Sequence, residues 1–599
     1  MRIETVAVTA ILALMSGLQA AHAAVTVSIS PGYTQLAGGP TLQFSANVTG
    51  SSNTAVTWQV DNANGGTPAW GTISTAGLYT MPATLPDPAL VTVTAVSQAD
   101  PSASATAAIT LLAQAPSGTT YYVATNGNDG NSGSQAAPWL TIQHAADTVA
   151  AGDTVLVRGG VYNEHVGFSA SGDSAHGIIT FANYPGETAV IDGTGLDIPH
   201  GQFGLFTFAD ISNVVAEGFE LRNYKTTKLN EVPIGIYVTG AGRGLEIVNN
   251  HIHNIETRAK TNPNQCGSDA FGLTVYGTRA PQAIQSLAIA GNEIDHLKTG
   301  CSETLSLDGN VRKFAVLNNR VHDDDNIAIG AIGFERVSHV EKYDQARDGM
   351  IRGNTVYNIT SYGNPDYGRQ YAADGIYVDG GRNIIIEQNL IHHSDLGIEL
   401  ASEHSSHVSS YVTARNNVIY AGNSAGVSIG GYGRKRGGTD HCIVINNTLY
   451  GNDTKKTGSG EFQVQYYATN NLFENNIAYA TPQALMVNDF TDSSANPATV
   501  DYNLWFSDVG ANKAHFVWQK TRYTGYDAWR NASGQDADSP PFSDPQFVTL
   551  GNTPDLDIQP SSPAANTGIV LDPNVVGTVD FAGSARVQNG TINIGAYEQ

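Results

Sequence analysis

The sequence predicts an all-β protein in which a small β-sandwich precedes a right-handed parallel β-helix. The first observation is a short pattern between residues 245 and 479, an apolar run followed by Asn and another apolar residue, that returns in copy after copy. The second is that apolar residues alternate within each copy, which is the period of a strand with one buried face. Because one such unit cannot bury its apolar face alone, consecutive copies must stack.

The repeated asparagine marks the same turn in every coil. LEIVNNHIH (245–253) and IIIEQNLIH (384–392) are two of the copies, and a second strand such as GIYVDG (375–380) follows in each coil. Parallel crossovers favour a right-handed winding. We interpret the asparagines as a ladder of side-chain amides that satisfies backbone groups at the turn. The marker residues are Asn250, Asn292, Asn319, Asn354, Asn389, Asn417, Asn447 and Asn476.

Residues 1–23 have the pattern of a secretory signal peptide. Arg2 precedes an apolar stretch, and Ala21-His22-Ala23 fits a cleavage site. We therefore expect a secreted monomer, extracellular or periplasmic, with no later segment that spans a membrane. The formal net charge of −24, with only 30 Lys and Arg, disfavours nucleic acid as a partner.

Residues 24–113 are expected to form the β-sandwich. Short alternating segments such as AVTWQVD and VTVTAVS are separated by turn residues, and Trp58 is the expected core aromatic. GTISTAGLYTMPA in this region resembles bacterial immunoglobulin-like domains, which implies a spacer or a carbohydrate-binding accessory. Residues 114–120 form a polar Pro/Gly linker.

The β-helix is expected to occupy residues 121–599, with a cap at its start. TIQHAADTVA (141–150) has helical spacing and can cover the open edge of the stacked strands. The segment from Tyr121 resembles the first coil of secreted β-helix polysaccharide lyases. The irregular ending DFAGSARVQNGTINIGAYEQ resembles the last coils of such proteins. These resemblances imply a pectin-lyase-like solenoid that is active on carbohydrate.

The three cysteines are too few to hold this fold by cross-links. Cys266 and Cys301 lie in the turns before second strands of consecutive coils, where they are placed to pair. Cys442 takes an inward position and is expected to be a buried thiol.

Several carboxylates are expected to converge on one outer face of the β-helix. Alignment of the second strands directs Asp379 and Glu399 outward as diagonal neighbours, with Cβ atoms ~7–8 Å apart. Asp374 and Asp395 lie just before these strands. Carboxylates this close repel one another unless a cation lies among them or one holds a proton. Asp308 lies in the Asp379 column two aligned coils away and is placed to extend a sugar-binding groove.

The same alignment sets two further expectations. It places Ile327 and Ile329 inward, in register with Leu305 and Leu307. It also puts Tyr377 in an outward column with Glu399, as a candidate substrate contact.

ADGIYV and HHSDLGIEL resemble the calcium site of polysaccharide lyase family 9. The resemblance implies that Asp374, Asp395 and Glu399 bind Ca²⁺, which would bind a uronate carboxylate and acidify the neighbouring proton. The sequence departs from that motif at Leu396, where the family has an acidic ligand, and at Ser428, where it has a lysine base.

A basic loop beside this site supplies candidates for the missing base. GYGRKRGG carries Arg434, Lys435 and Arg436, which could act as base or as clamp for the substrate carboxylate. His404, in ASEHSSH, is a further candidate for a general base or a substrate contact.

A second resemblance meets on the same residues. GIYVDGG and GIELASEH resemble the paired-carboxylate site of β-helix glycoside hydrolases such as family 120. The resemblance implies Asp379 as nucleophile and Glu399 as acid/base, with carboxyl groups ~5–5.5 Å apart in a retaining enzyme and ~6.5–9.5 Å apart in an inverting one. It leaves Asp374 and Asp395 as supporting residues or as ligands of a stabilising calcium.

The sequence thus predicts a secreted enzyme whose substrate is a polysaccharide. The favoured reaction is calcium-dependent β-elimination on a uronate-containing polymer. A glycoside hydrolase that uses the Asp379 and Glu399 pair remains open, as does a non-catalytic β-helix that binds glycans or adheres. Fold alone does not decide among them, because β-helices carry many functions.

Overall fold

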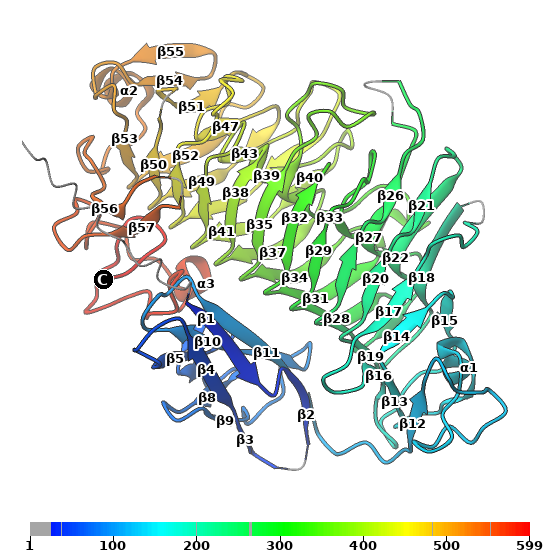
Figure 1. Ribbon diagram of the computed structural model, residues 1–599. Helices are drawn as coiled ribbons and strands as arrows, with labels where there is room; N and C mark the ends of the chain where they lie inside the picture. The colour runs from blue at the N-terminus through cyan, green and yellow to red at the C-terminus, as the bar shows by residue number, and fades with distance from the viewer. Residues whose placement is uncertain (1–24, 38, 199–200, 263–265, 482, 552) are drawn as a thin grey trace, which may run out of the picture.

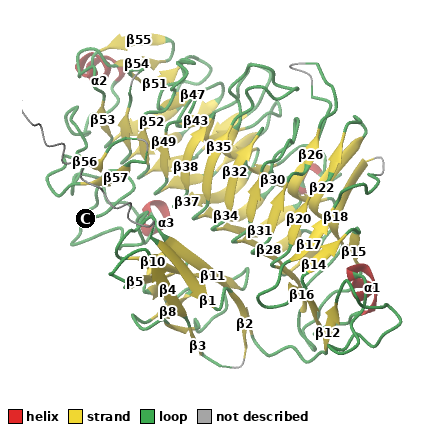
Figure 2. Cartoon of the chain, in the orientation of Figure 1, coloured by secondary structure: helices red, strands yellow, loops and turns green. Residues whose placement is uncertain are grey.

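The computed structural model describes residues 25–599, apart from residues 38, 199–200, 263–265, 482 and 552. The expected signal peptide therefore lies outside the described residues. Strands, yellow in Figure 2, dominate the chain, and the helices found within the described residues are short. These are α1 (Ile142–Thr148), α2 (Tyr526–Ser533), α3 (Pro573–Val576) and a 3-10 turn at Glu341–Tyr343.

Three long parallel sheets run side by side along the molecule (Figure 1), which confirms the predicted parallel β-helix. Within the described residues, sheet A has 17 strands, sheet B has 12 and sheet C has 13. Sheet A comprises β12 (Thr120–Val123), β13 (Thr154–Val157), β16 (Ile179–Asn183), β19 (Val214–Glu217), β23 (Gly242–Arg243), β24 (Leu245–Val248), β28 (Ile284–Ala290), β31 (Val311–Leu317), β34 (Arg347–Arg352), β37 (Arg382–Glu387), β40 (Val408–Ser410), β41 (Thr413–Arg415), β44 (Gly438–Asp440), β45 (Ile443–Ile445), β48 (Ala468–Thr469), β49 (Asn471–Glu474) and β52 (Ala498–Asp501).

Sheets B and C form the other two sides of each coil. Sheet B comprises β14 (Gly160–Tyr162), β17 (Ala189–Asp192), β20 (Glu220–Arg222), β25 (His251–His253), β29 (Glu293–Asp295), β32 (Arg320–Asp324), β35 (Thr355–Ile359), β38 (Leu390–Ser394), β42 (Val418–Tyr420), β46 (Thr448–Tyr450), β50 (Ile477–Tyr479) and β53 (Leu504–Phe506). Sheet C comprises β15 (Val166–Phe168), β18 (Gly201–Ala209), β22 (Glu231–Thr239), β27 (Phe271–Gly277), β30 (Leu305–Gly309), β33 (Ile329–Ile332), β36 (Asp374–Asp379), β39 (Leu396–Ala401), β43 (Val427–Ile429), β47 (Phe462–Val464), β51 (Leu485–Asp489), β54 (His515–Trp518) and β55 (Thr521–Thr524). Short pairs lie outside them: β21 (Lys225–Thr226) with β26 (Glu256–Thr257), and β56 (Phe547–Thr549) with β57 (Asp555–Ile558).

The predicted asparagine ladder is present in the core of the coils. The Asn354 side chain donates to the Val316 carbonyl at 3.0 Å and to Asn389 Oδ1 at 3.0 Å. Its own Oδ1 accepts the backbone N–H of Asn319 at 2.9 Å. The same three bonds recur from coil to coil, so each amide satisfies backbone groups that have no water within reach.

Replacing Asn354 by Ala is therefore expected to destabilise the β-helix. The change leaves the Val316 carbonyl and the Asn319 N–H unpaired, at about 1–3 kcal/mol for each buried group. Denaturant unfolding measures the loss, and Asn496→Ala at an exposed site is the control, expected to stay within about 0.5 kcal/mol of the parent. Equal effects of the two changes would contradict the role of the ladder.

One expected register is wrong by two residues. Leu305 pairs with Ile329 and Leu307 with Ala331, so Ile327 lies before the strand and Gly330 takes the outward place expected for Ala328. The alternation expected for this strand is correct, because a slip of two residues keeps every side chain on the same face.

The helix, the disulfide and the buried thiol that the sequence suggested for the β-helix are present. Helix α1 lies at the N-terminal end of the coils beside β15 (Figure 1), with the Thr141 side chain accepting the His144 N–H at its start. Cys266 and Cys301 form a disulfide, and Cys442 is a buried free thiol.

The N-terminal region forms small, mostly antiparallel sheets with their own core, in which Trp58 packs on Phe44. Figure 1 shows these blue strands alongside β28 and β31 of sheet A. Leu90 and Ala108 join an apolar cluster with sheet A residues, so the region is packed onto the β-helix and is no free spacer. The strands are β1 (Thr26–Ser30), β2 (Tyr33–Ala37), β3 (Thr41–Gln43), β4 (Ser45–Thr49), β5 (Val56–Val60), β6 (Ala63–Asn64), β7 (Gly66–Thr67), β8 (Gly71–Ile73), β9 (Leu78–Thr80), β10 (Leu90–Ser97) and β11 (Ser104–Leu112).

Candidate active site

Asp379 and Glu399 lie on the outer face of sheet C, whereas Asp374 and Asp395 lie where strands β36 and β39 begin. Tyr377 on β36 is in register with Glu399 on β39, and Asp379 is in register with Ala401. Asp379 and Glu399 are therefore diagonal neighbours on adjacent strands, as expected. The alternate residues of both strands point inward and are fully buried, which fixes the outward direction of the acids.

Glu399 is held by the next two coils. Its Oε1 accepts the Ser428 hydroxyl at 3.0 Å and the Gln465 amide at 2.5 Å. Burial raises the pKa of the Glu399 carboxyl to about 7, although the two hydrogen bonds oppose the shift. Ser428 thus serves as a donor that orients Glu399.

Asp374, the first residue of β36, is buried beside Glu399. Only 2% of Asp374 is exposed, and its Oδ1 has no hydrogen-bond partner. Burial, and then the negative charges of Glu399 and Asp395, raise the pKa of this carboxyl well above its usual range. An unneutralised carboxylate in this place is unfavourable, so the site favours a proton or a cation.

Asp395 differs from Asp374 because its oxygens are already occupied. Oδ2 accepts the Ser361 N–H at 2.8 Å, the Ser361 hydroxyl at 3.2 Å and the Ala373 N–H at 3.1 Å. Oδ1 accepts the Asn423 amide at 2.8 Å. These bonds tie together the turns that precede β36 and β39, so the structure gives Asp395 a positioning role beside Asp374.

Asp379 belongs to a group that also contains His404 and Glu335. The His404 Nε2 lies 3.0 Å from Glu335 Oε1 and 3.8 Å from Asp379 Oδ2. The Glu403 backbone N–H donates to Asp379 Oδ1 at 2.7 Å. Burial and the Glu403 charge raise the pKa of Asp379 well above its usual range, whereas the bond to His404 lowers the pKa of Glu335.

Glu403 is the main residue that the sequence reasoning missed. It lies past the end of β39, where strand alternation gives no direction, although it directly precedes His404 in the sequence. Its Oε1 accepts the Tyr377 hydroxyl at 3.3 Å, and its Oε2 lies 3.8 Å from Arg436 Nη1. Its charge also helps to raise the pKa values of Asp374, Asp379 and Glu399.

Glu303 and Asp308 extend the acidic face to the preceding coils. Burial, and then the charge of Asp269, raise the pKa of Glu303 to about 8. A Cβ atom at Gly330 would lie 3.1 Å from the Glu303 side chain, so the glycine gives Glu303 its room. Asp308 is 4% exposed and has an unpartnered Oδ1. Only Asp308 of the two was expected from the sequence.

A pocket of about 560 Å³ opens beside the acidic face. The cationic side chains that line it come from two loops: Arg336 from residues 333–346, and Lys435 and Arg436 from the basic loop. His404 lies at the junction of the pocket with the acids. Arg434 points elsewhere, with its guanidinium 5.8 Å from the centre of the Tyr466 ring. The remaining lining residues are Phe334, Ser338, His339, Glu341, Asp344, Glu403, Ser405 and His407.

The raised carboxyl pKa values make the stability of the cation-free protein fall as pH rises. Glu399 and Glu303 titrate near 4.5 in the unfolded chain but hold protons to about 7 and about 8 when folded. Between these values the folded state binds more protons, so the free energy of unfolding decreases from about pH 4.5 to about pH 8. Below that window these two groups contribute no slope.

Thermal melting in chelator across this pH range measures the effect. The double variant Glu399→Gln, Glu303→Gln is expected to melt with a flatter pH dependence than the parent protein. A stability that rises through the same window, or an unchanged slope in the double variant, would contradict the assignment of these pKa values.

Two family models match this chain. One is described as a Pel9A-like right-handed β-helix region and matches residues 121–275, and the other, a right-handed β-helix region, matches residues 330–510. Both confirm the predicted right-handed winding. No helix among the described residues has the length and apolar character needed to cross a membrane.

Two curated proteins and a solved structure are also similar. The uncharacterized protein YwoF of Bacillus subtilis is 35% identical over 449 residues, which cover 75% of this chain and 92% of YwoF. Pectate lyase PEL9 of Emericella nidulans is 29% identical over 212 residues, 34% of this chain and 48% of that enzyme. The crystal structure of pectate lyase Pel9A superposes with a TM-score of 0.45 at 15% identity, covering 81% of this chain and 97% of that one.

Proposed function

This chain belongs to the same family as YwoF, and its first coils match the Pel9A-like right-handed β-helix model, from which we propose that it is a polysaccharide lyase. Its substrate would be an acidic, uronate-containing polymer, cleaved by β-elimination with Ca²⁺ as cofactor. The partial similarity to pectate lyase PEL9 supports this class of reaction. A secreted location, which the N-terminal residues predict, suits a polymer that cannot enter a cell.

The main supporting observation is that a cluster of unneutralised carboxylates adjoins a pocket in which Arg336, Lys435 and Arg436 lie beside Glu341, Asp344 and Glu403. Asp374, with its unpartnered Oδ1, would hold the ion together with Glu399, while Asp395 lies beside them and keeps the two turns in place. Oxygen ligands on rigid strands suit Ca²⁺. When bound, the ion would bind the uronate carboxylate and acidify the proton on the adjacent carbon.

Three basic side chains in this pocket are suited to an acidic substrate. The chain has only 30 Lys and Arg against 54 Asp and Glu, yet Arg336, Lys435 and Arg436 line one pocket, together with Glu341, Asp344 and Glu403. Guanidinium groups bind carboxylates with two parallel hydrogen bonds. We assign Arg336 and Arg436 to the carboxylates of neighbouring sugars, and Lys435 to proton abstraction.

His404 is the other base that the geometry offers, and pH separates the two. A general base acts only after it has lost its proton, so its removal abolishes the rising limb of the pH–rate profile. The kcat/KM profiles of Lys435→Ala and His404→Ala, compared with the parent, identify the base. The residue whose replacement removes the rising limb of the profile is the base.

A glycoside hydrolase is the second candidate. Ser428 takes the position at which a family 9 lyase has its lysine. Its hydroxyl donates a hydrogen bond to Glu399 and so orients that carboxylate. In this alternative Asp379 would be the nucleophile and Glu399 the acid/base.

One assay distinguishes the candidates. Acidic and neutral polysaccharides are followed together by ultraviolet absorbance, which reports unsaturated sugar ends, and by reducing ends, with chelator and with Ca²⁺ restored. The lyase is expected to raise both signals on an acidic polymer, to lose both in chelator and to regain them with Ca²⁺. Reducing ends without absorbance would replace the lyase with the hydrolase, and neither signal would favour a non-catalytic glycan binder.

A further inference from the structure

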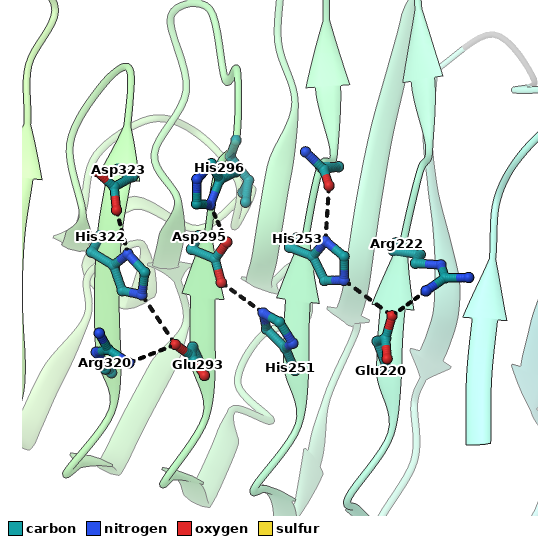
Figure 3. Close-up of polar contacts among 12 residues, drawn as sticks. Glu220, Arg222, His251, His253, Glu293, Asp295, His296, Arg320, His322 and Asp323 are labelled. Carbon is teal, nitrogen blue, oxygen red and sulfur yellow. Dashed lines mark hydrogen bonds and ion pairs between the residues drawn. The ribbon is translucent and has the colours of Figure 1, made fainter. Parts of the chain in front are cut away.

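A second cluster of ionisable side chains lies on sheet B, away from the sheet that carries the candidate active site. Figure 3 shows histidines and carboxylates alternating across β25, β29 and β32. His251 is in register with Glu293, and Asp295 is in register with His322. Neighbouring coils therefore bring imidazole and carboxylate groups into contact on one outer face.

The contacts in this cluster are close and directed. His322 Nε2 lies 3.1 Å from Glu293 Oε1, and His251 Nε2 lies 2.6 Å from Asp295 Oδ2. One donor atom each of Glu293, Asp295 and His322 lies within 4.8 Å of the other two. The His322 and Asp295 side chains are only 8% and 9% exposed, whereas Glu293 is 38% exposed and leaves the cluster open to solvent.

We propose that Glu293, Asp295 and His322 form a binding site for a divalent transition-metal ion of the Zn²⁺ class. Mixed imidazole and carboxylate ligands suit Zn²⁺ better than Ca²⁺, which prefers oxygen alone. Two ligands at ~2.0–2.1 Å from a tetrahedral ion lie roughly 3.3 Å apart. The separation of His322 Nε2 from Glu293 Oε1 is already close to that value.

The surroundings of His322 give an independent reason to regard it as a ligand. Its Nδ1 lies 2.7 Å from Asp323 Oδ2, and its ring stacks on Tyr357 with centroids 4.5 Å apart. A metal-binding histidine commonly donates its other ring N–H to a carboxylate, which fixes the tautomer and the ring orientation. Figure 3 shows the Nδ1 side of the His322 ring facing Asp323 and the Nε2 side facing Glu293.

The bound ion would join two successive coils. Asp295 lies on β29 and His322 on β32, so the ion would add a side-chain link between strands that already share backbone pairing, an ion pair and the asparagine ladder. An ion bound only by the folded state raises its stability. The expected consequence is a more stable N-terminal half of the β-helix, independent of the reaction on sheet C.

Co²⁺ is the probe, because its visible absorption reports nitrogen ligands and low coordination. The full chain is freed of metal with chelator and titrated with Co²⁺ and then Zn²⁺, with Ca²⁺ in excess so that all-oxygen sites are filled. We expect one Co²⁺ per chain with intense visible bands, displaced by Zn²⁺, and a rise in Tm. Absence of the bands and of the Tm shift would overturn the proposal.

Variants locate the ion. His322→Phe keeps a ring on Tyr357 and Glu293→Gln keeps the shape, and both are expected to abolish the bands. Asp323→Asn, which leaves all the ligands in place, is expected to weaken binding by about 10–100-fold. His253→Phe, whose imidazole contacts Glu220 instead, is the matched control and should bind as the parent does.

One other group could hold the ion and is tested in the same way. Glu335, Asp379 and His404 also bring their donor atoms within 4.8 Å of one another. His404→Phe is expected to keep the Co²⁺ bands. If His404→Phe loses them while His322→Phe retains them, the ion lies on sheet C and the proposal is wrong.

Discussion

Replacing Asp374 by Asn is expected to lower kcat/KM by about 10³-fold, the size of effect produced by removing one electrostatic group from a preorganised site. The same change is expected to leave the chelator-treated protein as stable as the parent or more stable. Asp374 is a buried carboxyl with a raised pKa and an unpartnered oxygen, so its charge opposes folding at neutral pH. An amide of the same shape removes that charge.

Asp395→Asn is the matched control for this prediction. Asp374 is the first residue of β36, and Asp395 directly precedes β39 in the next coil. Asp395 accepts four hydrogen bonds, and an amide NH₂ would face donors that now point at a carboxylate oxygen. We expect a loss of about 1–3 kcal/mol for each donor left unpaired. Melting in chelator and in Ca²⁺ separates the two variants: Asp374→Asn should lose the rise in Tm caused by Ca²⁺. An Asp374→Asn enzyme with near-normal activity would remove the cation site from the mechanism.

The site residues that lie on strands were predictable. In a strand, side chains alternate between the two faces, so the sequence alone gives the face on which each one lies. Asp379 and Glu399 alternate with inward apolar residues, and the repeat places them on adjacent coils. Period two cannot detect a slip of two residues, which is why Ile327 was placed in the position that Ile329 occupies.

The loop-borne part was not predictable, because it depends on how distant turns approach one another. Glu335 meets His404 across 69 residues of sequence, and Glu403 reaches Arg436 from a different coil. No repeat position covers these residues. The contacts of these residues follow only from distances in the folded chain.

A buried ion pair between the N-terminal region and sheet A carries the second large prediction. Arg352 Nη2 lies 2.8 Å from Asp61 Oδ2, and the two side chains are 7% and 0% exposed. Asp61 also accepts the N–H and the hydroxyl of Thr92, at 2.8 Å and 3.0 Å. Arg352 lies beside Glu387, which pairs with Arg415 at 2.7 Å.

This network continues to the other end of the chain. Arg415 Nη1 donates to the Asn574 carbonyl of α3 at 2.8 Å, and the Gln388 amide donates to the Asp580 carbonyl at 2.7 Å. The N-terminal region, the middle coils and the C-terminal segment are therefore connected through one row of charges on sheet A. We infer that the N-terminal region stabilises the β-helix and does not act as a spacer between the β-helix and a partner.

Asp61→Asn should accordingly destabilise the whole protein by about 3–5 kcal/mol, because it removes the nearer of the two carboxylates beside the buried Arg352 guanidinium. Asn tolerates the left-handed backbone of Asp61, at φ 47°, so the loss is electrostatic rather than conformational.

Lys313→Gln is the control at the same interface. It breaks the Lys313–Asp87 pair, whose side chains are 43% and 46% exposed, and should cost at most about 1 kcal/mol. Unfolding followed by tryptophan fluorescence and by circular dichroism tests both changes. Comparable small losses would mean that the N-terminal region is an appendage, whereas a large loss for Asp61→Asn alone requires that it folds as part of the β-helix.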